Sequence, residues 1–180
     1  MSKKKAKEQK PESGSETIQA DNLPVTIHAQ YVRDISFENP NAPEALRGGQ
    51  GLPEMDISIG MDAREIKDAT IKNMYEVVLN VRAMAKRKEN VVFIAELQYG
   101  VTVSISDQVP DETIHPLLLI EIPRLAFPYA RQIISDLTVN GGYPPLLLNP
   151  VDFHALYMQR FAKEIEESRK KASETNKVKT

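Results

Sequence analysis

Two pairs of closely spaced carboxylates in this 180-residue chain could support acid–base catalysis. Asp34 stands four residues before Glu38, and Glu54 stands two residues before Asp56. Two carboxylates in different environments can divide general acid and general base roles. Neither pair sits in a recognisable catalytic frame, and such pairs arise by chance in an acidic chain. We therefore read them as surface charge rather than as an active site.

Other catalytic and metal-binding signatures are missing. The chain has no cysteine, which excludes disulfides, cysteine nucleophiles and cysteine metal ligands. Its histidines lack paired ligand spacing: His28, His115 and His154. There is no GxxxxGK[ST], no GxGxxG after a strand, no GxSxG and no HExxH. The GGQG at 48–51 is typical of a flexible loop, so we predict no enzyme, no cofactor and no bound metal.

Charge is unevenly distributed along the chain. Residues 1–16 and 163–180 each carry a net charge of +2, whereas the body between them carries −6. An acidic body argues against nucleic acid as the main ligand. The basic N-terminus is followed by no apolar stretch, and the longest apolar run, Leu117 to Ile120, is too short to span a membrane. We expect a soluble protein that stays in the cytoplasm.

The first half of the chain alternates between apolar and polar residues, which predicts strands. One strand is expected from Val25 through Phe37, with all its odd-numbered apolar residues on one face. A Pro- and Gly-rich loop, 39–53, follows. Met55, Ile57 and Ile59 predict a second strand. Two longer strands, with apolar rows from Tyr75 to Ala83 and from Val91 to Ile105, are expected to form an antiparallel hairpin, with Gly100 allowing a bend or bulge.

The second half has helical spacing. Phe127, Ala130 and Leu137 lie on one face of a helix that should stop at residues 140–142. The preceding run LLLIEI predicts a short buried helix, which Pro123 and Pro128 are expected to separate from the longer one. In the last helix, Asn149 is the expected N-cap and Pro150 the first helical residue. Strands followed by helices predict an α+β fold with helices against one side of an antiparallel sheet.

Five ordered segments resemble the SecB family of protein-export chaperones. They are YVRDISFENPNAP from Tyr31, MYEVVLNV from Met74, FIAELQYG from Phe93, FPYARQIISDL from Phe127 and GGYPPLLLNPVDFHALYM from Gly141. The resemblance implies a four-stranded antiparallel sheet and a homotetramer built as a dimer of dimers. It also implies a chaperone that holds unfolded secretory precursors and delivers them to the export motor SecA. SecB-like chaperones dedicated to toxin–antitoxin systems are the alternative.

The resemblance assigns two surfaces. Positions matching Asp34, Glu38, Ile94 and Glu96 form the acidic face that docks the basic, zinc-bearing tail of SecA, and strand parity places them on one face. A groove for unfolded clients is expected at these residues: Phe37, Leu52, Met55, Ile57, Ile59, Phe153 and Tyr157. Flexible Met and aliphatic walls suit clients of many sequences. For Phe153 and Tyr157 a core position is equally compatible with the pattern, and the loop before the second strand lacks the aromatic residue that many relatives carry.

Three segments complete the expected organisation. Residues 1–23 are predicted to be a disordered arm, 24–165 a SecB-like domain and 166–180 a flexible charged tail. No nucleic acid partner and no direct insertion into a membrane are expected. The identity of the clients is not written in the chain.

Overall fold

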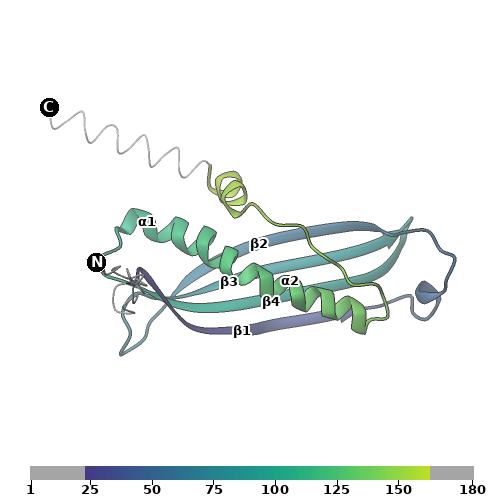
Figure 1. Ribbon diagram of the computed structural model, residues 1–180, viewed down its shortest axis with the longest axis horizontal. Coiled ribbons are helices and arrows are strands. Elements are labelled where there is room, and N and C mark those ends of the chain that lie inside the picture. Colours follow the sequence, from purple (N-terminus) through teal and green to yellow (C-terminus); the bar gives the residue numbers. More distant parts are fainter. Residues whose placement is uncertain (1–22, 163–180) are drawn as a thin grey trace, which may run out of the picture.

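The computed structural model describes residues 23–162, which form one antiparallel sheet with helices on one of its faces (Figure 1). The elements are β1 (Val25–Glu38), the 3₁₀ turn η2 (Glu44–Leu46), β2 (Glu54–Ile66), β3 (Met74–Arg87), β4 (Asn90–Ile105), α1 (Asp111–Pro116), the π-helical segment η3 (Leu117–Glu121), α2 (Ile122–Asn140) and a final helix over 153–162. The strand order is β1-β4-β3-β2. The predicted α+β class and four-stranded sheet are confirmed. The predicted arm, apart from Leu23, and the tail lie outside the described residues.

The two faces of the sheet differ in chemistry. Odd-numbered residues of β3 and β4 point toward the helices and form the core with η3 and α2, among them Val77, Leu97 and Val103. Even-numbered residues of the same strands point to the uncovered side, which we call the open face. Most side chains of the open face are polar, as expected for an antiparallel sheet with one solvated side. The apolar ones that these two strands add to it include Val78, Met84 and Ile94.

Strand β1 departs from the predicted alternation at two bulges. Its pairing with β4 shifts between Ile27 and Ala29 and again between Val32 and Asp34. Each bulge inserts one extra residue and reverses which parity faces the helices. The prediction that all odd-numbered residues of β1 share a face is therefore wrong, because Tyr31 lies on the open face.

Gly100 is required by the position of Tyr31. It stands opposite Tyr31 in the ladder, and a Cβ at residue 100 would lie 2.6 Å from the tyrosine ring. The ring crosses β4 here, which lets its hydroxyl reach Glu76 on β3. The bulges expected near Gly100 occur in β1 instead, since the ladder between β3 and β4 runs through Gly100 without a shift.

Gly100→Ala should lower the free energy of unfolding by about 1–3 kcal/mol, because the added methyl overlaps the ring of Tyr31. Adding Tyr31→Ala should remove the overlap, so the double variant should lose less than the sum of the single losses. Urea unfolding of the three variants checks this. Strict additivity would show that the ring and the glycine do not share this space.

The helices also differ from expectation at two points. Pro123 and Pro128 do not break the helix, because α1, η3 and α2 are continuous from 111 to 140. Pro123 lies just after the π-helical segment η3, where the regular α-helical hydrogen bonding is already altered, so its missing N–H does not interrupt the helix. The last helix begins at residue 153 rather than at Pro150, and Asp152 caps it by accepting a hydrogen bond from the Ala155 N–H at 2.9 Å.

Candidate functional site

The open face brings all four residues of the predicted acidic surface together. Asp34 pairs with Gln98 in the ladder, and Glu38 pairs with Ile94. Glu96 lies between these rungs, opposite Ser36. The strand parity inferred from the sequence is correct at this end of β1, since the second bulge comes before Asp34.

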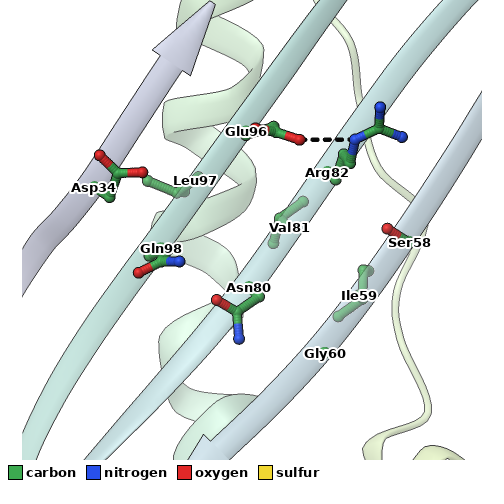
Figure 2. Close-up of a pocket in the computed structure, with 10 residues that line it drawn as sticks. All are labelled: Asp34, Ser58, Ile59, Gly60, Asn80, Val81, Arg82, Glu96, Leu97 and Gln98. Atoms are coloured by element: carbon green, nitrogen blue, oxygen red, sulfur yellow. Dashed lines mark hydrogen bonds and ion pairs between the residues drawn. The ribbon is translucent and has the colours of Figure 1, made fainter.

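A shallow hollow of about 390 Å³ lies on this face, and Figure 2 looks into it with the helices behind the strands. Asp34, Gln98, Asn80 and Ser58 present polar groups, each from a different strand. Leu97, Val81 and Ile59 supply its floor and direct their side chains toward the helices. A polar, open hollow of this kind fits a protein segment better than a small apolar ligand.

Glu96 is not a free carboxylate. Its Oε1 accepts a hydrogen bond from Arg82 Nε at 2.7 Å, and both side chains are about half exposed (Figure 2). An exposed pair of this kind contributes about 0–1 kcal/mol, so a partner could compete for either charge. The sequence analysis did not single out Arg82, although its even position in β3 places it on the side of the strand opposite to the apolar row.

Asp56 is a further acid that the sequence analysis did not assign to this surface. It is exposed on β2 and pairs in the ladder with Met84, which pairs with Ile94. Even-numbered residues of β2 therefore extend the acidic end of the open face to the far edge of the sheet.

The other end of the open face holds a buried charge cluster around Glu76, which is 3% exposed. Its carboxylate accepts hydrogen bonds from the Tyr31 hydroxyl, from Arg33 Nη1 at 3.3 Å and from Arg64 Nε. Burial alone would raise the pKa of Glu76, but the hydrogen bonds from Tyr31 and Arg64 and the charges of Arg33 and Arg64 lower it. Glu76 is thus a paired anion, and burial together with its hydrogen bond to Glu76 raises the pKa of Tyr31.

The apolar residues of the predicted client groove are not all brought together. Leu52, Met55 and Ile57 are exposed, and Met55 and Ile57 are on the helix side of β2, where 38% and 42% of their surfaces are open. Ile59 is partly covered. Phe153 and Tyr157 are buried in the core, and the Tyr157 hydroxyl lies 2.8 Å from His115 Nδ1. Phe153 and Tyr157 are therefore core residues and do not line an open groove.

Phe37 belongs to a different cluster. It stacks on Phe93 at 5.6 Å between ring centroids, and Tyr143 lies against both rings. Two strands, β4 and β3, lie between Phe37 on β1 and the apolar residues of β2. Tyr143 was missed because its loop, GGYPP, has no periodicity, and it adds an aromatic residue beside the loop that lacks one.

The described residues show no metal site and no membrane span. No group of three or more His, Asp or Glu side chains within 23–162 could hold a metal ion. No helix in that range is long and apolar enough to cross a membrane.

Comparison with known proteins identifies the family. The model of the SecB family, described as preprotein translocase subunit SecB, matches residues 18–164. The protein-export protein SecB of Rhodospirillum centenum is 46% identical over 79% of this chain and 82% of its own length. The chain belongs to the SecB family. The corresponding protein of Maricaulis maris is 46% identical over 85% of this chain and 86% of its own.

A solved structure shares the fold. It is the SecB-like chaperone of Mycobacterium tuberculosis in complex with a peptide from an antitoxin, with a TM-score of 0.58 over 71% of this chain and 91% of that one. Its sequence identity of 19% supports the fold alone. The export-protein relatives, at 46%, are much more similar, so a role in protein export is better supported than one in a toxin–antitoxin system.

Proposed function

We propose that this SecB-family chaperone captures unfolded secretory precursors in the cytoplasm and transfers them to SecA through its open face, without catalysis of its own. The observation that carries the proposal is the separation of two surfaces by the sheet. Acids gather on the open face, and exposed apolar side chains of β2 lie on the other. The same sheet can therefore hold a client on the helix side of β2 while its open face meets a second protein.

The client surface consists of Leu52, Met55, Ile57 and Ile59. These side chains are apolar and accessible, and folded proteins expose few such segments of their own. An extended client would place alternate side chains against them, as peptides do when they lie along a strand. Binding should therefore select unfolded chains.

The SecA surface consists of Asp34, Glu38, Ile94 and Glu96, with Asp56 at its edge. A basic tail would be attracted to these carboxylates, and complementary charge raises association rates and fixes the register of binding. We expect the interaction to weaken as salt rises.

A capture-and-transfer assay tests the function directly. An unfolded secretory precursor should stay soluble and unfolded in the presence of this protein, and adding SecA should move it to the motor. A folded version of the same precursor should not be captured. Failure to delay folding or aggregation of the unfolded precursor would overturn the proposal.

Self-association is proposed to use the outer side of α2 together with β1. Leu125 and Tyr129 on α2 are 56% and 54% exposed, and β1 exposes Val32 and Ile35 on the helix side at the edge of the sheet. α2 runs across β4 toward β1 (Figure 1). Tyr129 stacks on Tyr99 of β4 at 6.3 Å between ring centroids, and Tyr99 pairs in the ladder with Val32, so the exposed groups of α2 and β1 adjoin. Burial between copies would remove them from water, and a dimer of dimers would offer several client surfaces to one long chain.

Tyr129→Asp should reduce the assembled mass, because it places a charge in the proposed contact between copies. Light scattering at micromolar concentration should show a tetramer for the unaltered chain and a smaller species for the variant. His154→Asp adds a charge at another exposed position, on the last helix, and should leave the mass unchanged. A tetrameric Tyr129→Asp variant would place the interface elsewhere.

A further inference from the structure

The open face carries two charge poles rather than one. The acidic pole is formed by Asp34, Glu38 and Glu96 at one end. The basic pole is the pair Arg33 and Arg64 at the other. A second hollow, of about 200 Å³, lies at the basic pole and shares Asn80 and Gln98 with the hollow of Figure 2. The two hollows therefore adjoin on one continuous surface.

The two arginines of the basic pole have N–H donors that are not used within the sheet. Arg33 donates to Glu76 through Nη1 and Arg64 through Nε, while their side chains are 44% and 65% exposed. A guanidinium carries five N–H donors. Within residues 23–162, the other N–H groups of these two side chains have no hydrogen-bond partner, so they can serve a ligand from outside.

The charge balance at this pole favours an anion. Glu76 is a single carboxylate shared by two guanidinium groups, which leaves one positive charge in excess. Asp62, which also lines the hollow, is held by Arg160 Nη2 at 2.8 Å, and Arg160 also donates to the Met61 carbonyl. Asp62, the one acid besides Glu76 that lines this hollow, is therefore already paired with an arginine of its own.

We infer that the basic pole is a binding subsite for an acidic side chain of the protein segment that docks on the open face. A carboxylate fits the free edges of two guanidinium groups, which bind it through charge-assisted hydrogen bonds. The inference rests on the proposed function, since the segment is taken to be part of SecA. The docking segment must then carry an acidic residue as well as basic ones.

The register of the strands sets the distance between the acidic pole and the basic pole. Asp34 is level with Gln98 on β4, and Glu76 is level with Thr102. From Gln98 or Glu96 to Thr102 is four or six residues, or about 13–20 Å along a strand. In an extended segment, the acidic residue should therefore lie about four to six residues from the basic residues that contact the acidic pole.

The test is a double-mutant cycle measured by titration calorimetry of the assembled protein with SecA. Arg64→Gln should weaken SecA binding about five- to tenfold, and Arg64→Glu should weaken it further. Arg47→Gln is the matched control, because Arg47 is also exposed and paired with a glutamate, Glu44 at 3.7 Å, but lies outside the open face. Client capture serves as a check that each variant is folded.

The second arm of the cycle changes each acid of the docking segment of SecA to its amide in turn. One such change should weaken binding to the unaltered chain and have no further effect on Arg64→Gln. Binding equal for Arg64→Gln and Arg47→Gln, or additive losses with every amide, would overturn the subsite while leaving SecA docking in place. No SecA binding by the unaltered chain would overturn the proposed docking itself.

Discussion

Glu96→Lys should weaken SecA binding by more than about tenfold while client capture and assembly are retained. The side chain of Glu96 lies on the open face, away from the core row of Ala95 and Leu97. The change replaces attraction for a basic tail with repulsion. It also sets a lysine beside Arg82, whose Nε lies 2.7 Å from the carboxylate of Glu96. The site thus gains two units of positive charge without a change in packing.

The cost to stability should be small by comparison. Loss of the half-exposed pair removes about 0–1 kcal/mol, and the new contact between like charges is screened by water. Calorimetry with SecA, beside light scattering and a client assay, separates the two effects. Normal binding by a folded, assembled Glu96→Lys protein would refute the assignment of the acidic face.

Two controls make the charge argument specific. Glu44→Lys makes the same reversal beside another arginine, Arg47, but off the open face, and should leave binding unchanged. Arg82→Gln removes the cation that competes for Glu96 and should strengthen binding of a basic tail. Opposite signs for Glu96→Lys and Arg82→Gln would identify local charge, rather than structural damage, as the cause.

Strand periodicity predicted most of the sheet because burial on one face imposes a period of two. The apolar rows of β3 and β4 correctly predicted both strands, the hairpin that they form and the face of the sheet on which Glu96 lies. β2 was predicted too short. Gly60 and the charged residues Asp62 and Arg64 interrupt the pattern that predicts a strand, although the strand continues to Ile66. These charges are satisfied by partners on other elements, which are not apparent from the local sequence.

Bulges and prolines account for the remaining errors. The bulge before Asp34 is accompanied by contacts of Tyr31 and Arg33 with Glu76, which is more than forty residues away in the chain. Pro123 predicted a break from local propensity, but tertiary burial of the η3 side chains keeps the helix continuous. Long-range contacts of both kinds appear only when the chain is folded.

The site was predictable where it follows strand parity and unpredictable where it depends on pairing across strands. Asp34, Glu38, Ile94 and Glu96 were placed on one face from parity together with the resemblance to a family. The pairing of Glu96 with Arg82, and the basic pole beyond it, required the register of four strands. The charge pattern that a partner meets is therefore a property of the fold.

Met55→Asp together with Ile57→Asp should weaken capture of unfolded clients by about tenfold or more, because each change places a charge where an apolar client side chain would be buried. Both side chains are about 40% exposed on the helix side of β2, so neither is a core residue whose loss would unfold the sheet. The measurement is the concentration of chaperone needed to delay folding of a precursor by half. SecA binding should be unchanged, because Met55 and Ile57 face away from the docking surface.

Ser58→Asp is the matched control for this double variant. It adds a negative charge to the same strand, between the ladder positions of Ile57 and Ile59, but its side chain lies on the open face (Figure 2). Client capture should therefore be retained by Ser58→Asp and lost by the Met55 and Ile57 changes. Equal losses would mean that charge on β2 acts through the strand as a whole. Unchanged capture by an assembled Met55→Asp and Ile57→Asp protein would mean that the client groove lies on another part of the surface.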